Sequence, residues 1–325
     1  MNNFHKILLV SFFSVFGIYF AFSGEDLSTI IFHLGQVELS GIFIASGLLI
    51  ASCFIRSYRW KLLLDPFEVI PTHQVFSATM VGYFGNGILA FRLGELLKAY
   101  SVSSQGKITV SQAFGTVVLE RILDMLMVIF VFVLFLPWFP FQDSKIKLGA
   151  YIFLGTTIFL ILVLIFISKL ELLEKIGDFE IFKTKIGQNI LSIISSFYEG
   201  VMVIEKTGRS VNIALSSFLL WGLYYFITWI ILKSCAVPLT FVEIGILFVL
   251  GSLALGLPAL PGSVGTYDAA VKYTLMIIFG INGADALAYA LVSHAVSYFP
   301  LVMIGAIYFM LSNMRIKDLK PVELI

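Results

Sequence analysis

The sequence is poor in charged residues and lacks the residue clusters that carry metal, redox or hydrolytic chemistry. Only 13% of its 325 residues are charged, whereas a soluble domain carries about 25%. Its two cysteines, Cys53 and Cys235, are far apart and form no Cys-x-x-Cys unit. Neither His-x-x-x-His nor Gly-x-Ser-x-Gly occurs. We therefore expect no metal site, no cofactor and no catalytic nucleophile.

Apolar residues, in contrast, are abundant enough to place the chain in a membrane. They make up 59% of the sequence, and the mean hydropathy is +0.99. The net charge of +1 gives no basic surface for nucleic acid. The fold class that follows is an all-α polytopic membrane protein, because helices satisfy their own backbone groups inside lipid. We expect residues 1–325 to form a single membrane domain.

Several apolar runs reach the length of about 20 residues that a helix needs to cross about 30 Å of hydrocarbon. They are Ile7–Ser23, Ser40–Tyr58, Ala113–Phe139, Leu148–Ser168, Val211–Leu232 and Ala284–Leu311. The first could instead be a signal peptide, since Lys6 precedes it. It lacks a clean small-x-small cleavage site, which favours a first transmembrane helix.

Two further segments lie where a span is expected, yet they contain glycine, proline and charge. Val75–Tyr100 contains Gly85-Asn86-Gly87 and then Arg92-Leu93-Gly94-Glu95, while Phe241–Tyr273 contains Pro258, Pro261 and Asp268. Irregular backbone at membrane depth is tolerated only where it is buried in protein or lines a cavity. Paired interrupted segments also indicate a transport site. We expect each segment to form a broken helical hairpin.

Charge placement predicts the orientation of the chain. The loop Gly24–Leu39 has acidic residues but no Lys or Arg, so we expect it outside, while the basic cluster at 56–61 is expected in the cytoplasm. If Val75–Tyr100 crossed fully, the basic residues of 169–209 would be external, against the positive-inside rule. This segment is therefore predicted to be re-entrant, with both termini of the protein in the cytoplasm. For Phe241–Tyr273, charge counting leaves a re-entrant hairpin and two short crossings open.

The order of elements predicts an inverted repeat, an arrangement common among transporters. Residues 40–139 contain a span, an irregular segment and a span, and residues 211–311 contain the same order from the opposite side. Residues 169–210 would form the cytoplasmic connector. No residue-level identity between the halves supports this interpretation.

Three ionisable residues fall inside the expected span Ala113–Phe139. The apolar stretch after Asp124 is too short to cross alone, so Glu120, Arg121 and Asp124 must lie within the bilayer. Their spacing places them on one side of a helix. Such residues usually mark a substrate or proton pathway. The alternative is a structural ion pair of Arg121 with Asp124 or with Glu95.

The first irregular segment ends in Arg92 and Glu95. A guanidinium is suited to bidentate phosphate capture, and Asn86 with the glycine amides beside it would add uncharged donors. In the structural alternative, Arg92 and Lys98 extend to cytoplasmic headgroups.

The second irregular segment supplies residues for an opposing gate. They are Pro258, Pro261, Gly262, Gly265 and Asp268. Asp268 lies where a half-helix would begin, as a helix-start carboxylate or as a titratable coupling group. Lys272, four residues later, is its expected partner. His294 in the last span could relay protons, although a hydrogen-bonded core histidine is the more common case.

Short motifs then occur in an order that resembles a known family. They are Arg59-Trp60, Asn86 with Arg92-x-Gly94-Glu95, Glu120-Arg121-x-x-Asp124, and Pro258 with Pro261-Gly262-x-x-Gly265 and Asp268. The chain resembles, over nearly its whole length, the transmembrane region of lysylphosphatidylglycerol synthases and the related stand-alone flippase-like proteins. The family tends to have proline where this chain has Ala90 and glutamate where it has Asp268. The soluble aminoacyl-transfer domain is not matched, so lysyl transfer is not implied.

The resemblance implies translocation of a phospholipid or a polyprenyl-linked lipid between leaflets of the inner membrane. Its anionic headgroup would contact Arg92, with Arg59 and Arg121 as second contacts. Glu95, Glu120 and Asp124 would position these arginines or carry a coupling proton. Two alternatives stay open: an enzyme acting on a lipid phosphate with Glu120 or Asp124 as base, and a non-transporting accessory subunit. A second copy of the chain is a further candidate partner.

Overall fold

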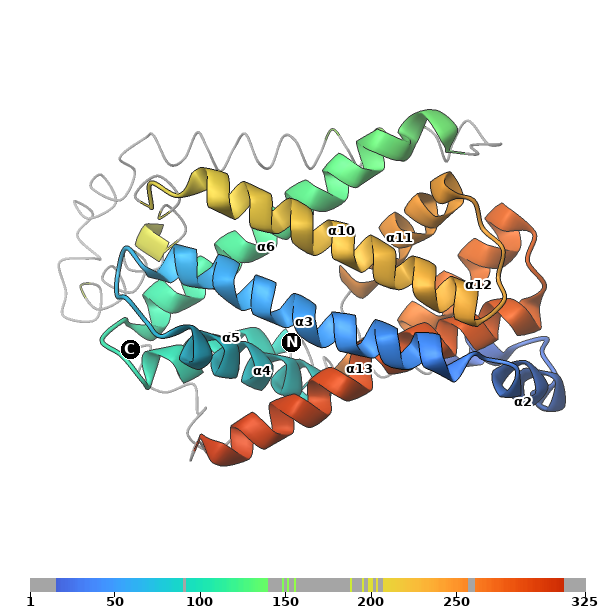
Figure 1. Cartoon of the computed structure of the whole chain (residues 1–325), viewed down its shortest axis with the longest axis horizontal. Coiled ribbons are helices and arrows are strands. Elements are labelled where there is room, and N and C mark those ends of the chain that lie inside the picture. Colours follow the sequence, from blue (N-terminus) through green and yellow to red (C-terminus); the bar gives the residue numbers. More distant parts are fainter. Residues whose placement is uncertain are drawn as a thin grey trace.

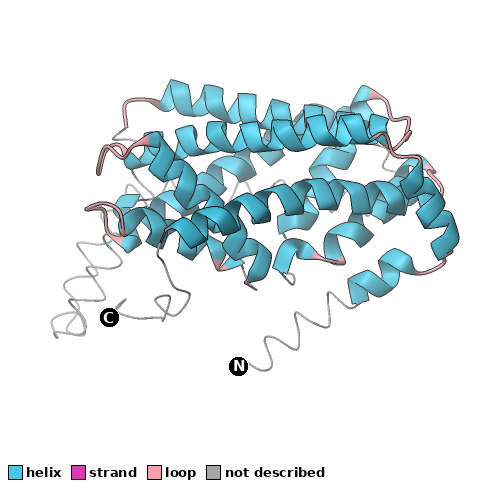
Figure 2. Ribbon diagram, turned by 60° about the horizontal axis from the view of Figure 1, so that its bottom comes forward, coloured by secondary structure: helices cyan, strands magenta, loops and turns pink. Residues whose placement is uncertain are grey.

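The computed structural model describes residues 16–89, 92–139, 207–256 and 261–312, with isolated positions between 148 and 203. Within these ranges every regular element is a helix (Figure 2), and the expected all-α membrane fold is confirmed. The expected span Leu148–Ser168, most of the connector 169–210 and the first half of the span Ile7–Ser23 lie outside the described residues.

Four long helices form the frame of the described part (Figure 1). They are α3 (Leu39–Leu64), α6 (Val110–Phe135), α10 (Ser210–Ser234) and α13 (Gly283–Leu311). Three of them, α3, α10 and α13, are long and apolar enough to cross a membrane. Helix α6 has 26 residues, about 39 Å of helix. Its three ionisable residues lie near its middle, whereas those of α3 lie in its last third.

Shorter elements lie between the long helices. They are α2 (Leu27–Gly35), α4 (Thr72–Ile88), α5 (Gly94–Ser103), η2 (Leu136–Trp138), α11 (Phe241–Gly256), η4 (Pro261–Ser263) and α12 (Thr266–Phe279). Residues 16–22 are helical as well. Helix α2 corrects the expectation of a plain loop at Gly24–Leu39. The Asp26 carboxylate caps this helix by accepting a hydrogen bond from the Thr29 amide at 3.2 Å.

Helices α4 and α5 form the first hairpin, and its base closes at one end of the molecule. The chain leaves helical geometry at Leu89, and small residues let the two arms approach closely. A Cβ atom on Gly94 would lie 2.3 Å from the Asn86 amide nitrogen. At the base, the Glu68 carboxylate accepts hydrogen bonds from the amides of Lys107 (2.5 Å) and Ile108 (3.0 Å). The hairpin therefore begins and ends on the same side, as the sequence predicts.

Helices α11 and α12, with η4 between them, form the second hairpin at the opposite end (Figure 1). Val237 and Leu239 precede it, Phe279 is its last residue, Ile281 follows it, and all four pack in one apolar cluster. The second hairpin thus also begins and ends on one side. The α10–α11 turn lies beside the start of α3, where the Glu38 amide donates a hydrogen bond to the Ser234 carbonyl at 2.9 Å.

The tips of the two hairpins meet beside the middle of α13. Tyr298 donates its hydroxyl to the Gly87 carbonyl at 3.0 Å, and its ring lies against Gly262. Arg92, between α4 and α5, donates to the Leu255 carbonyl near the end of α11. Contacts between hairpin tips favour a re-entrant second hairpin over two separate crossings.

Each hairpin packs on its own apolar core. Around the first hairpin, the core includes Trp60, Val75, Val102 and Val117 from α3 to α6. Around the second, it includes Ile231, Leu247, Val271, Leu275 and Tyr289 from α10 to α13. The order of long helix, hairpin and long helix is therefore the same in both halves. An inverted relation between the halves stays a prediction.

Candidate functional site

A network of charged side chains lies inside the first half of the molecule. Its members come from three helices: Arg56 and Arg59 of α3, Glu95 and Lys98 of α5, and Glu120, Arg121 and Asp124 of α6. The helical spacing of each pair or triplet turns its side chains to one face. Packing of α3 and α5 on α6 then brings these faces together.

Asp124 contacts three arginines. Its Oδ1 atom lies 2.6 Å from Arg59 Nη2, and its Oδ2 atom lies 3.0 Å from Arg56 Nη1 and 3.3 Å from Arg121 Nη1. Trp221 of α10 also donates to it at 3.5 Å. The expected pair of Arg121 with Asp124 is therefore present, but Arg59 and Arg56 lie closer to the carboxylate.

Glu120 is fully buried and is surrounded by cations in the same way. Its Oε1 atom lies 2.6 Å from Arg56 Nη1, and its Oε2 atom lies 2.5 Å from Lys98 Nζ. The Lys98 ammonium group also lies 4.0 Å from the ring centre of Trp60. Burial of Lys98 corrects the interpretation that it extends to headgroups, because only 3% of this residue is exposed.

The network contains more positive than negative groups. Four cations (Arg56, Arg59, Lys98 and Arg121) face three carboxylates (Glu95, Glu120 and Asp124), which leaves one positive charge in excess. Buried charge is costly unless it is paired. An anion bound at the edge of the network would therefore be stabilised by it.

Arg121 and Glu95 form the edge at which the network reaches a surface. Arg121 Nη2 lies 3.3 Å from Glu95 Oε1, and 35% of the Arg121 side chain is exposed. Asn86 also donates to Glu95 Oε1 at 3.3 Å. The expected Arg121–Glu95 pair and the neighbouring position of Asn86 are thus both present. Glu95 Oε2, Asn86 Oδ1 and Arg121 Nε are buried without a hydrogen-bond partner, so two acceptors and one donor are left unused at this edge.

Arg92 lies at the tip of the first hairpin, as expected, in a conformation that is rare outside glycine. Its φ angle is 55°, in the left-handed region that costs a non-glycine residue free energy. The residue is exposed, and its guanidinium donates to the Leu255 carbonyl of the second hairpin. Arg92 therefore links the two tips.

A cavity of about 280 Å³ opens beside Arg92 and Arg121. It runs between the first hairpin and α6, and Glu95 borders it as well. The remaining lining is apolar: Leu93, Leu96, Phe114, Val117 and Val118. The lining surface is thus almost wholly apolar, and the charged residues Arg92, Arg121 and Glu95 border it.

The residues of the expected gate in the second hairpin take different positions. Pro258 lies outside the described residues. Pro261 begins η4, and Gly262 and Gly265 have φ angles of 74° and 83°, which only glycine adopts without strain. Asp268 accepts a hydrogen bond from the Gly265 amide at 2.9 Å, so it caps α12 as expected.

The expected pair of Asp268 with Lys272 is wrong. Asp268 Oδ1 lies 2.8 Å from His294 Nδ1, whereas Lys272 Nζ lies 3.0 Å from Glu25. Lys272 also donates to the carbonyls of Ala21 (2.8 Å) and Ser23 (3.1 Å). Spacing along one helix suggested the pair, but α13 and the N-terminal segment offer each side chain a partner outside that helix.

Arg59 is placed differently from the expectation of a substrate contact. Its side chain is fully buried and is held by Asp124 and by Ser217, to which it donates at 3.1 Å. The most important residue that sequence reasoning missed is Arg56, which contacts both buried carboxylates. Arg56 lies three residues before Arg59, and this shared helical face was the available signal.

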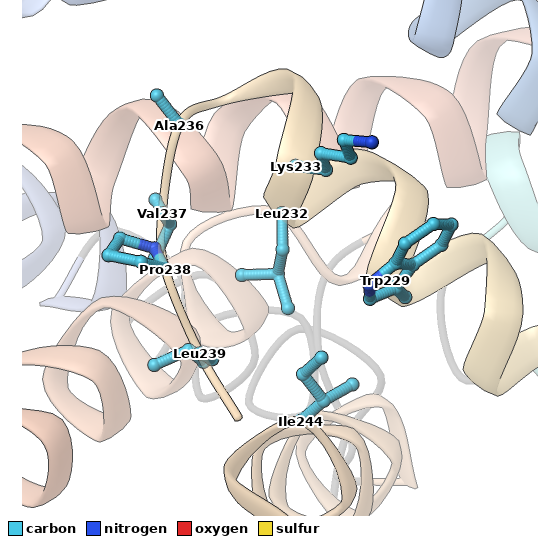
Figure 3. Close-up of a pocket in the computed structure, with 8 residues that line it drawn as sticks. All are labelled: Trp229, Leu232, Lys233, Ala236, Val237, Pro238, Leu239 and Ile244. Atoms are coloured by element: carbon cyan, nitrogen blue, oxygen red, sulfur yellow. The ribbon is translucent and has the colours of Figure 1, made fainter. Parts of the chain in front are cut away.

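A second cavity, of about 260 Å³, lies at the end of α10 (Figure 3). It is lined by Trp229 and Lys233 and by apolar residues of the α10–α11 turn. Lys233 Nζ lies 5.4 Å from the ring centre of Trp229. Tryptophan and lysine at a helix end are typical of anchoring at a membrane interface, and we assign no substrate to this cavity.

Comparisons with known proteins agree with the membrane fold. The family described as lysylphosphatidylglycerol synthase TM region matches residues 6–305. A UPF0104 membrane protein of Pyrococcus horikoshii is 26% identical over 295 residues, which cover 84% of this chain and 87% of that protein. A UPF0104 membrane protein of Methanocaldococcus jannaschii is 26% identical over 333 residues, covering 97% and 96%. The glycosyltransferase AglD of Haloferax volcanii is 21% identical over 323 residues, covering 88% of this chain and 51% of AglD.

Proposed function

The chain belongs to the family of the lysylphosphatidylglycerol synthase transmembrane region, and we propose that it moves a lipid with an anionic headgroup between the leaflets of the cell's inner membrane. The lipid is an anionic phospholipid or a polyprenyl-linked lipid. In this proposal the base of the first hairpin faces the cytoplasm, where the basic residues of its flanking loops gather.

The single observation that carries the proposal is the cavity between the first hairpin and α6. Its lining surface is almost wholly apolar, and the charged residues Arg92, Arg121 and Glu95 border it. Paired guanidinium groups suit the oxygens of a phosphate. The apolar walls would accept the first methylene groups of the acyl or prenyl chain, while the remaining chain stays in lipid.

The excess positive charge of the buried network supports an anionic substrate. Arg121 contacts Glu95, Glu120 and Asp124 and is also partly exposed. A phosphate at this edge would gain attraction from Arg121 while the three carboxylates keep its guanidinium in place. A zwitterionic or cationic headgroup would gain less, because its own positive group faces the same cations.

Arg92 would couple headgroup binding to movement of the hairpin tips. Its guanidinium donates to the Leu255 carbonyl. Charge-assisted bonds to phosphate are stronger than a bond to a neutral carbonyl. A headgroup would therefore draw Arg92 away from Leu255 and separate the two tips, opening a path between the halves.

We propose transport rather than catalysis. Glu120 and Asp124, the candidate bases, each lie within 3.0 Å of two cations, and such pairing makes a carboxylate a weak base. The name of AglD concerns glycosyl transfer, and this chain matches only half of that protein. Incubation of the purified protein with lipid phosphates in detergent should leave the lipids unchanged by mass spectrometry.

The test uses the purified protein in phosphatidylcholine vesicles with a trace of fluorescent phosphatidylglycerol, and fluorescent polyprenyl phosphate in a parallel series. Dithionite added outside bleaches only lipids that reach the outer leaflet. The wild-type protein should speed bleaching of the inner-leaflet pool. Arg92→Gln should slow it about tenfold or more, since a charge-assisted hydrogen bond contributes about 1.5–3 kcal/mol.

Two matched variants complete the design. Arg209→Gln removes an exposed arginine that pairs with Asp65 at 2.7 Å, away from the cavity, and should leave the rate unchanged. Arg92→Lys keeps the charge but loses the bidentate fork, so it should fall between wild type and Arg92→Gln. Bleaching no faster than in protein-free vesicles, for both labelled lipids, would contradict the proposal.

A further inference from the structure

His294 lies between two hydrogen-bond acceptors at the tip of the second hairpin. Its Nδ1 atom is 2.8 Å from Asp268 Oδ1, and its Nε2 atom is 2.8 Å from the Gly262 carbonyl oxygen. A carbonyl oxygen can only accept, so Nε2 must carry a hydrogen. An ionised carboxylate also only accepts, so Nδ1 then needs a hydrogen as well. Both contacts together require one proton more than neutral imidazole and carboxylate contain.

We propose that His294 and Asp268 form a proton-binding site that holds the tip of the second hairpin closed. With the proton bound, the pair is an imidazolium beside a carboxylate, or an imidazole beside a carboxylic acid. These two descriptions contain the same number of protons. In either one, His294 is bonded on both sides, and η4 is tied to α13 through Gly262.

Loss of the proton breaks one of the two contacts. The proton leaves to water, and the neutral imidazole keeps a single N–H group. This N–H group keeps its hydrogen bond to Asp268, because a charge-assisted bond to a carboxylate is stronger than a bond to a neutral carbonyl. Nε2 then turns a lone pair toward the lone pairs of the Gly262 oxygen. This contact is repulsive, so the tip is released.

The backbone around Gly262 can change conformation when its contact with His294 is lost. Gly262 and Ser263 both have φ angles in the left-handed region, 74° and 62°, and for Ser263 that conformation carries strain. The tip also contacts the ring of Tyr298, whose hydroxyl holds Gly87 of the first hairpin. A change at His294 therefore reaches the contact between both hairpins.

Within the part of the chain that the structure describes, few ionisable groups besides Asp268 lie near His294. The ring centre of Tyr267 in α12 lies 5.4 Å from that of His294, and the ring centre of Tyr298 in α13 lies 6.1 Å from it. The Tyr267 hydroxyl is hydrogen-bonded to Ser293. On α12, Lys272 is engaged by Glu25. From the first hairpin, Arg92 contributes the cation at the opposing tip. The pair is only slightly exposed, with 13% of the His294 side chain and 6% of that of Asp268 accessible.

Proton binding stands on this geometry, whereas its link to lipid movement rests on the proposed function. A bound proton would hold the second hairpin while a headgroup at Arg92 loosens the first. Proton release and headgroup binding would then act on the same pair of tips from opposite sides.

The first experiment detects protonation of the His294 ring directly. The chain has four histidines, so ¹⁵N-histidine labelling gives few signals, and His294→Gln assigns one of them. The His294 signals should show both nitrogens protonated at about pH 5.5 and a single N–H at about pH 9. Asp268→Asn should shift this titration to lower pH. A neutral imidazole over the whole range, with no effect of Asp268→Asn, would overturn the proposal.

The second experiment measures how accessible the tip of the second hairpin is to a maleimide. Ser263→Cys is placed in a chain carrying Cys53→Ala and Cys235→Ala, and its rate of maleimide modification is divided by the rate in the same chain with His294→Gln. This division cancels ionisation of the thiol. The ratio should rise about tenfold from low to high pH, since the lost bond is worth about 1.5 kcal/mol. A ratio that does not change with pH would overturn the proposal that the His294–Asp268 pair holds the tip closed.

His33→Gln is the matched control, because His33 also pairs with an aspartate, Asp285, at 2.6 Å but lies away from the tip. It should leave the Ser263→Cys modification profile unchanged. The wild-type titration needs no substitution at the tip, so it still decides the question if His294→Gln does not fold. Titration of His294 without any lipid movement would refute only the proposed function. Lipid movement without that titration would refute only the proton site.

Discussion

Asp124 Oδ1 lies 2.6 Å from Arg59 Nη2, which joins side chains 65 positions apart in the sequence. Arg59 has no exposed surface, and Asp124 has 8%. This contact holds α3 against α6 at membrane depth. It therefore gives Arg59, a motif residue in sequence, a structural contact in the core.

Loss of a carboxylate from the buried network should cost more than loss of an arginine. Asp124→Asn should lower the free energy of unfolding by about 3–5 kcal/mol, because it takes the nearest carboxylate from Arg59 and adds to the excess of buried positive charge. Arg59→Gln should cost less, because Arg56 and Arg121 still neutralise Asp124. Thermal unfolding of the purified proteins in detergent compares the two variants.

The control for these variants is Lys61→Gln. Lys61 pairs with Asp65 at 2.5 Å within one helix, near a helix end, and its loss should change stability by no more than about 1 kcal/mol. A larger decrease in the free energy of unfolding for Arg59→Gln than for Asp124→Asn would contradict an excess of positive charge in the network.

Gly94→Ala should disrupt the first hairpin. The new Cβ atom would lie 2.3 Å from the Asn86 amide nitrogen and 2.6 Å from its side-chain oxygen, so α4 and α5 would have to separate. Overpacking of this kind costs about 1–3 kcal/mol. Gly222→Ala is the control, since no atom lies within 4 Å of its Cβ position. An unchanged unfolding temperature for Gly94→Ala would show that the two arms are not in close contact.

The ends of the hairpins should react with a membrane-impermeant maleimide from defined sides. In a chain without Cys53 and Cys235, Thr72→Cys and Ser104→Cys should react only in inverted vesicles, because both flank the base of the first hairpin, which we predict to face the cytoplasm. Thr240→Cys, before the second hairpin, should react only in intact cells. Reaction of Thr72→Cys and Ser104→Cys from opposite sides would mean that the first hairpin crosses the membrane.

Lys272→Met should release the segment before α2 from α12. It removes the contact with Glu25 and the bonds to the carbonyls of Ala21 and Ser23. Hydrogen exchange of the amides in residues 16–26 should accelerate, while exchange in α10 stays unchanged. Lys233→Met, at an exposed lysine over Trp229, should leave both regions as in the wild type.

Local rules predicted most of the secondary structure correctly. The expected span Ser40–Tyr58 corresponds to α3 and the expected span Ala284–Leu311 to α13, because a long apolar run is helical in lipid whatever its neighbours are. Glycine and charge in Val75–Tyr100 indicated the break between α4 and α5. Helix α2 was missed because its stretch is short and lies outside the spans.

The partners of the charged residues were harder to predict. Spacing within one helix identified the contact of Arg121 with Asp124, which lie three residues apart. The same rule failed for Lys272 and Asp268, because both found partners on other segments. Contacts between residues as distant as Arg56 and Glu120 depend on how the helices pack, and no local pattern records that.

The sequence by itself determined that this chain lies in a membrane, which stretches form its long apolar helices, and which two segments break. These features follow from the cost of exposing backbone and charge to hydrocarbon, which is set residue by residue. Only the tertiary structure decided which charges are buried with each other and which face the cavity. Arg59 and Arg92 are both motif arginines, yet packing of α3 against α6 encloses the first, while the hairpin tip leaves the second exposed.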